Sequence, residues 1–176
     1  MEWLLPPVIS GQVVTIHTLS FLSLGCSTFN ATVSSATWPV ANKAYYIPFR
    51  LPVPIVVNQL FFFNGATASG NIDVGIYDQA GTRLTSAGST AQSGTNALQA
   101  FDITDIQLGP GWFYLAGAAS ATATTVFRFG MGVVERCKLL GVLNQTSALA
   151  LPAVATFAIA SEVNIPIVGL AGRVTL

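Results

Sequence analysis

Few residues of this chain could carry out chemistry, and the sequence places them far apart. His17 is the only histidine, so a serine or cysteine nucleophile activated by a histidine base would have to use it. It lies in an apolar alternating run with no acidic residue nearby in the sequence, and a catalytic triad also needs an acid that orients the imidazole. We therefore interpret His17 as a structural residue and predict that the chain is not an enzyme.

The acidic residues form two close pairs in the sequence, Asp73 with Asp78 and Asp102 with Asp105. Asp78 and Asp105 occupy positions where a turn favours aspartate, because its side chain bonds the nearby backbone. A glycosidase needs two carboxyl groups at a defined separation, and nothing in the sequence fixes one. A calcium site at Asp73, Asp78 or Asp102 stays open, since Ca²⁺ accepts scattered oxygen ligands. No DxDxDG loop is present, and we predict no catalytic residue, metal site or cofactor.

Cys26 and Cys137 are the only cysteines. They could pair, but two cysteines so far apart make no recognisable disulfide framework. We interpret both as free, buried thiols, because cysteine is among the most buried residue types. The sequence has no CxxC motif and no metal-ligand spacing.

Aromatic residues could form a platform for a sugar ring. Trp38, Tyr45 and Tyr46 are the first candidates, followed by Tyr77 and Trp112. The alternative interpretation is packing in the core and at sheet edges, since aromatic side chains dominate core burial. Two coplanar exposed rings would indicate a carbohydrate-binding module, whereas buried rings would indicate packing.

The elements that must position these residues have the period of β-strands. Residues 71–77 alternate, with apolar side chains at every second position, as in a strand buried on one face. Residues 55–63 form an apolar run that Asn64-Gly65 should close as a turn with positive φ. Residues 78–81 predict a hairpin turn, and 82–87 its return strand.

The same rhythm continues to the end of the chain. Strands are expected at 97–103, with Asp102 to Asp105 ending the strand, and at 112–117 and 125–131; residues 133–142 should be a turn or short helix. Pro48 predicts an edge position or a bulge for its strand. Strands every 10 to 15 residues with turns between them predict an antiparallel, jelly-roll-like β-sandwich with less than about a tenth of its residues in helix.

The sequence predicts one domain with two parts. Residues 1–36 should be an N-terminal arm and first strand, and residues 37–176 the sandwich. Trp3, Leu4 and Leu5 are too apolar for a free solvated tail, while Pro6 and Pro7 favour an extended backbone. We expect these five residues to contact a neighbouring subunit or a capsid.

The composition is apolar and poor in charge. Hydrophobic residues make up 52%, charged residues only 8%, and the formal net charge is zero, against a usual charged fraction of roughly 25%. Such a surface does not attract nucleic acid or anionic lipid, and near-zero net charge favours association. The start lacks the basic residues of a signal peptide, and the uncharged stretch 139–161 contains too many polar and small residues for a membrane span.

The motifs from Trp38 onward resemble a module of structural proteins of tailed bacteriophages. They are W-P-x-A-N-x-A-Y-Y-x-P-F-R-L-P at 38–52, F-x-N-G-A-T-A-S-G-N-I-D-V-G-I-Y-D-Q-A-G-T-R-L at 62–84, G-S-T-A-Q-S-G-T-N at 88–96, D-I-T-D at 102–105 and L-G-P-G-W-F-Y-L-A at 108–116. The resemblance covers about half of the chain. Each motif alone contains only residues typical of turns, whereas the motifs as a set are moderately specific for this module.

The resemblance implies a virion protein with a β-sandwich fold and no catalytic residues. We expect a capsid decoration or cement protein that binds its own copies and the major capsid protein or tail proteins. The alternative is a tail-associated or receptor-binding module with a host glycan as ligand. A charge-poor surface favours burial in an assembly, and closed symmetry is the usual way to bury it. The expected homotrimer follows from analogy with such proteins.

Overall fold

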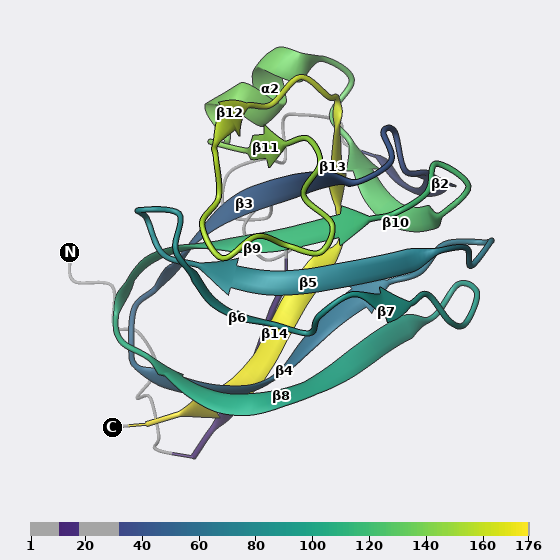
Figure 1. Ribbon diagram of the computed structural model, residues 1–176. Helices are drawn as coiled ribbons and strands as arrows, with labels where there is room; N and C mark the ends of the chain where they lie inside the picture. Colours follow the sequence, from purple (N-terminus) through teal and green to yellow (C-terminus); the bar gives the residue numbers. More distant parts are fainter. Residues whose placement is uncertain (1–10, 18–31, 176) are drawn as a thin grey trace.

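The computed structural model describes residues 11–17 and 32–175, and these residues form an all-β protein (Figure 1). A four-stranded sheet has the order β1 (Val13–His17), β14 (Val168–Val174), β4 (Ile55–Phe63), β8 (Leu98–Leu108). A seven-stranded sheet has the order β12 (Ala158–Ile159), β11 (Leu143–Gln145), β3 (Lys43–Leu51), β9 (Gly111–Ala119), β5 (Asn71–Tyr77), β6 (Arg83–Ser86), with β7 (Thr90–Ala91) also beside β5. A three-stranded sheet has the order β13 (Asn164–Pro166), β10 (Thr125–Gly130), β2 (Thr32–Thr37).

Every strand pair in these sheets is antiparallel, which confirms the predicted all-β sandwich. The only helix in the described part of the chain is α2 (Val134–Leu139), within the stretch expected to be a turn or short helix. No helix among the described residues is long and apolar enough to cross a membrane. The predicted arm contacts of Trp3, Leu4, Leu5, Pro6 and Pro7 lie outside the described residues.

The main core lies between the four-stranded and seven-stranded sheets. Alternate residues of β3, β5 and β9 face alternate residues of β4 and β14, and the branched and aromatic side chains of both sheets form one cluster. Ile72, Val74 and Ile76 lie in this cluster, as their spacing predicts. The period of two thus identifies the inward face of the sandwich.

The outer face of β5 is also buried, so the prediction of a strand buried on one face is wrong. Residues 146–157 cross this face, and Leu151 packs with Tyr77 in a second apolar cluster. The Tyr77 hydroxyl donates to the carbonyl of Pro152 at 2.6 Å, and the amide of Leu151 donates to Asp73 Oδ2 at 3.0 Å. A segment 75 to 78 residues further along the chain at these two contacts thus excludes solvent from the second face.

Two turn predictions have different outcomes. The hairpin at 78–81 is confirmed: Gly81 has φ +86° and its amide donates to the carbonyl of Asp78 at 3.2 Å. Gly65 does not have positive φ, so that part of the Asn64-Gly65 prediction is wrong. Glycine is needed there for space, because a Cβ would lie 2.7 Å from Thr125 Oγ1 and 2.9 Å from the carbonyl carbon of Thr125.

The structure also tests two predictions about strands, the end of a strand at 102–105 and the edge or bulge position of Pro48. Residues 102–105 do not end a strand, because β8 continues to Leu108 along β4 and Asp102 Oδ1 accepts a 2.7 Å hydrogen bond from Gln59 Nε2. Pro48 lies in an unbroken register with β9, so there is no bulge. On its other side β11 pairs only with residues 44–46 of β3, so Pro48 lies beyond the end of β11, at a locally open edge of the kind that tolerates proline.

Candidate functional site

The described residues considered for catalysis and metal binding do not form a cluster of metal ligands. No group of three or more His, Cys, Asp and Glu side chains in the described part of the chain could hold a metal ion. Asp73 is buried beneath residues 146–157, Asp78 accepts a turn hydrogen bond from the amide of Thr82 at 2.8 Å, and Asp102 lies on β8. His17 belongs to β1, and its side chain lies outside what the structure describes.

Cys137 lies on α2 as a buried, free thiol. Burial raises the pKa of this thiol to about 11, and the charge of Glu162 adds to the effect. The reactive form of cysteine is the thiolate. Cys137 therefore stays protonated at neutral pH and packs as a small apolar side chain.

The aromatic residues predicted as a glycan platform are buried, so they cannot serve as one. Trp38, Tyr45 and Tyr46 are each exposed by 1% or less. Trp38 packs edge-to-face on Tyr45 with ring centroids 5.3 Å apart, and its indole N–H donates to the carbonyl of Lys43 at 3.0 Å. Tyr46 packs edge-to-face on Tyr77 at 5.1 Å, and burial raises the pKa of Tyr46 to about 12. Their apolar faces contribute to the two cores instead.

Trp112 is the one exposed ring among the five aromatic candidates, with 53% of its surface accessible. It lies on β9 directly opposite Arg50 of β3, which is also exposed. Its neighbour on the same face, Tyr114, is half-buried and packs on Phe157 with centroids 4.9 Å apart. This face therefore offers one aromatic surface beside a guanidinium.

A buried polar cluster lies where β3 meets the segment between β12 and β13. Lys43 is 5% exposed, and its ammonium group lies 2.9 Å from Glu162 Oε1 and 2.9 Å from Ser161 Oγ. It also lies 5.9 Å from the centre of the Tyr45 ring. Asn144 donates to Ser161 Oγ at 3.4 Å. This cluster satisfies its own charges and anchors the connection onto the sheet.

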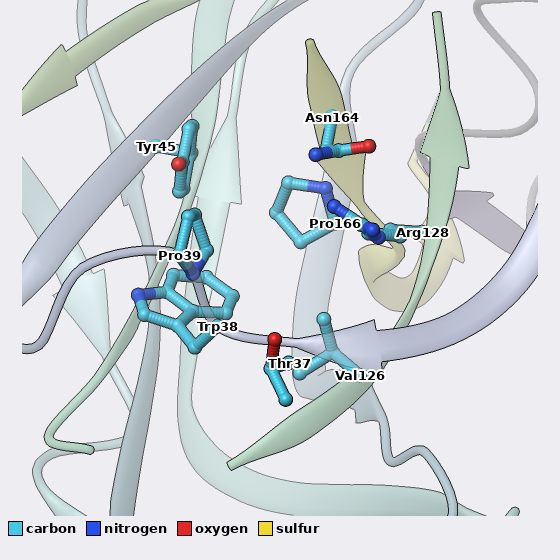
Figure 2. Close-up of a pocket in the computed structure, with 8 residues that line it drawn as sticks. All are labelled: Thr37, Trp38, Pro39, Tyr45, Val126, Arg128, Asn164 and Pro166. Carbon is cyan, nitrogen blue, oxygen red and sulfur yellow. The ribbon is translucent and has the colours of Figure 1, made fainter. Parts of the chain in front are cut away.

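A small cavity lies beside this cluster, between β3, β10 and β13 (Figure 2). Its volume is about 10 Å³, which is room for about one water molecule. The lining residues are Thr37, Trp38, Pro39, Tyr45, Val126, Arg128, Asn164 and Pro166. In Figure 2 the side chains of Arg128 and Asn164 extend from one wall and those of Tyr45 and Trp38 form the opposite wall.

The helix α2 lies beside β12 at the edge of the seven-stranded sheet (Figure 1). The exposed apolar side chains on and next to these two elements, Val133, Leu139 and Ile159, are here called the α2–β12 surface. Leu139 is exposed by 78%, Ile159 by 68% and Val133 by 47%. A shallow hollow of about 480 Å³ joins the helix to the strand and is lined by Val134, Lys138, Ile159, Ala160 and Ser161. Of the three exposed residues only Ile159 lines this hollow, and Val133 and Leu139 lie at the two ends of the helix that forms its other side. Exposed large apolar side chains on neighbouring elements are typical of contact sites.

Sequence reasoning missed the α2–β12 surface and the cavity for different reasons. Leu139 and Ile159 lie in an uncharged stretch of mostly small and apolar residues, and composition of this kind does not distinguish an exposed apolar side chain from a buried one. Arg128 and Asn164 come from strands 36 positions apart, and only their pairing in the three-stranded sheet brings them together. An arginine inside an alternating strand was the one available hint.

Comparison with known proteins gives no match for this chain: no protein-family model, no curated protein and no solved structure matches it.

Proposed function

We propose that this chain is a non-enzymatic structural protein of a virion, and that it decorates or cements the capsid of a tailed bacteriophage. The observation that carries the proposal is the α2–β12 surface. Leu139, Ile159 and Val133 expose large apolar side chains in a chain whose sequence has only seven basic and seven acidic residues. Contact between subunits or with a capsid would remove these side chains from water.

The strand order supports the jelly-roll form of the sandwich. The two main sheets contain eleven strands, and without the short strands β7, β11 and β12 eight remain: β1, β3, β4, β5, β6, β8, β9 and β14. Counted in that sequence, one sheet contains the first, eighth, third and sixth strands, and the other contains the second, seventh, fourth and fifth. That order matches the double Greek key of jelly rolls, which occur in viral capsid proteins and in lectins, and it supports the jelly-roll form that we propose. Because a fold alone does not define a function, the surface carries the proposal and the fold is consistent with it.

The test adds the purified protein to phage particles stripped of it. We expect the wild-type chain to bind and restore resistance of the particles to heat, and its mass in solution to be that of a homotrimer. The double variant Leu139→Glu with Ile159→Glu should lose binding, because it places charges in the contact.

The matched control is Val154→Glu. Val154 is similarly exposed, at 63%, but it lies on the segment that covers β5, where it bridges to Thr82. A stable monomer that ignores stripped particles would overturn the proposal. Equal loss of binding in both variants would also contradict it, because the effect would then be general charge.

The alternative function, a tail-associated module that binds a host glycan, is favoured by one observation, the exposed ring of Trp112. An exposed aromatic face beside Arg50 resembles one half of a sugar platform, and a ring can stack on the apolar face of a sugar. Binding to a glycan array that disappears in Trp112→Ala, with capsid binding absent, would support this alternative. Loss of glycan binding in Leu139→Glu but not in Trp112→Ala would exclude it.

A further inference from the structure

Two buried polar atoms at the small cavity of Figure 2 have no hydrogen-bond partner: the hydroxyl of Tyr45 and Nε of Arg128. Tyr45 is 99% buried, and burial raises the pKa of its hydroxyl. At neutral pH both groups therefore carry a proton that they can donate. Leaving two such donors unsatisfied in a protein interior is costly.

No side chain of the walls accepts a hydrogen bond from either of these two atoms. The indole N–H of Trp38 is already used on the carbonyl of Lys43. Asn164 extends its amide toward the cavity in Figure 2, and an amide group can present its donor side to a ligand. The remaining walls are mainly apolar, from Pro39, Val126 and Pro166.

The charges around the cavity leave one positive charge uncompensated. Three charged groups surround Tyr45: Lys43, Glu162 and Arg128. Lys43 and Glu162 form an ion pair at 2.9 Å, so they neutralise each other. No carboxylate among the described residues pairs with Arg128 within 4.0 Å. Desolvation lowers the pKa of this guanidinium, which indicates that its charge is poorly compensated.

We propose that this cavity binds one monovalent halide ion, held by Tyr45 and Arg128. The size of the cavity, about 10 Å³, excludes phosphate, sulfate and carboxylate groups, and the guanidinium repels a metal cation. A chloride ion is only slightly larger than a water molecule and accepts hydrogen bonds from every side. It therefore fits a site with two unsatisfied donors and a positive net charge.

The bound ion would link two layers of the protein. Tyr45 belongs to β3 of the seven-stranded sheet, while Arg128 belongs to β10 of the three-stranded sheet. An ion between them ties the small sheet to the sandwich. The inference is independent of the proposed function, because the cavity shares no residue with the α2–β12 surface.

The experiment is a thermal-unfolding titration of the full chain with sodium chloride at constant ionic strength, with sodium gluconate as the balancing salt. We expect the melting temperature to rise with chloride and to saturate. Tyr45→Phe should raise the apparent dissociation constant about tenfold, since it removes one charge-assisted hydrogen bond. Arg128→Lys keeps the charge but lacks Nε and should also weaken binding, and Arg50→Gln, which removes an exposed guanidinium elsewhere on β3, should leave it unchanged.

Crystals grown in sodium bromide give the position of the ion from anomalous scattering. A bromide peak within hydrogen-bond distance of both Tyr45 Oη and Arg128 Nε, together with the saturable chloride effect, would support the site. A water molecule in that position would overturn the proposal. A melting temperature that rises equally in gluconate, or equally in Tyr45→Phe, would overturn it as well, because the effect would then be one of salt in general.

Discussion

Asp73 gives the sharpest test of how the outer face of the seven-stranded sheet is held. Its side chain is fully buried beneath residues 146–157, and its Oδ2 accepts the amide proton of Leu151 at 3.0 Å. Beside it, Arg83 donates to the carbonyl of Leu151. Asp73→Asn keeps an oxygen that can accept from Leu151, whereas Asp73→Leu leaves that amide without a partner. We expect Asp73→Leu to lower the free energy of unfolding by about 1–3 kcal/mol.

The pH dependence separates the charge of Asp73 from its hydrogen bond. Burial raises the pKa of Asp73 above its ordinary value of 3.8, although the amide of Leu151 and the charge of Arg83 partly oppose the rise. Above pH 3.8 the unfolded chain loses this proton before the folded chain does. The folded state then binds more protons, so the wild type loses stability as pH rises, until the pH passes the folded-state pKa. The loss relative to Asp73→Asn is at most about 1.4 kcal/mol per pH unit.

The assay is urea unfolding of the wild type, Asp73→Asn and Asp73→Leu at pH values from acid to neutral. The stability of Asp73→Asn relative to the wild type should increase with pH above 3.8 and then level off. Asp105→Asn, on the exposed part of β8, measures the general effect of removing one negative charge. A difference between Asp73→Asn and wild type that stays flat, or that decreases with pH, would refute the reasoning.

Three further substitutions test packing, ion pairing and the segment over β5. In Gly172→Ala the new Cβ would clash with the carbonyl of Val56 and lie 3.0 Å from the Cα of Val57, so the free energy of unfolding should fall by about 1–3 kcal/mol; Gly109→Ala, with open space around it, should change it little. Lys43→Met breaks the ion pair with Glu162 and should cost about 1.5–3 kcal/mol in chemical denaturation, whereas Lys138→Met, which breaks an exposed 4.0 Å pair, should cost less than about 0.5 kcal/mol. Tyr77→Phe removes the hydrogen bond to Pro152 and should cost about 1 kcal/mol and expose residues 146–157 to protease; unchanged proteolysis would show that the apolar contacts alone hold this segment.

The sequence predicted the parts of the fold that depend on local pattern. Alternation at residues 71–77 identifies the inward face of β5, and the residues at 78–81 specify their own turn by hydrogen bonds within the loop. The covering segment could not be predicted, because Leu151 meets Asp73 and Tyr77 only through the folded topology. The local alternation of apolar residues identifies one face of a strand. Whether solvent reaches the other face depends on a segment that is distant in the sequence.

The candidate sites show the same limit. Trp38, Tyr45 and Tyr46 are aromatic residues of the kind that bind sugars, but the residue type does not reveal which face is exposed, and all three are buried. Leu139 and Ile159 are residue types common in cores and are instead among the most exposed large apolar side chains of the described part of the chain. Exposure depends on which elements lie over a residue, and that is a property of the assembled sheets.

The loops at one end of the sandwich explain why turn motifs in the sequence are informative about fold but not about function. Asn64 donates to Gln99 Oε1 at 3.0 Å, and Gln92 donates to Asn64 Oδ1 at 3.0 Å and to the carbonyl of Thr125 at 2.8 Å. Gln92 Oε1 also accepts from the amide of Ser69 at 2.8 Å.

Asn64 and Gln92 are buried, so replacing either one would leave partners unsatisfied. These residues come from the motifs at 62–84 and 88–96, the same motifs on which the resemblance to phage structural proteins depends. Their side chains form hydrogen bonds within these loops, so they are not available to a partner. A specific function has to reside in residues that the network leaves free, and for this chain the exposed apolar side chains of the α2–β12 surface are the first place to test it.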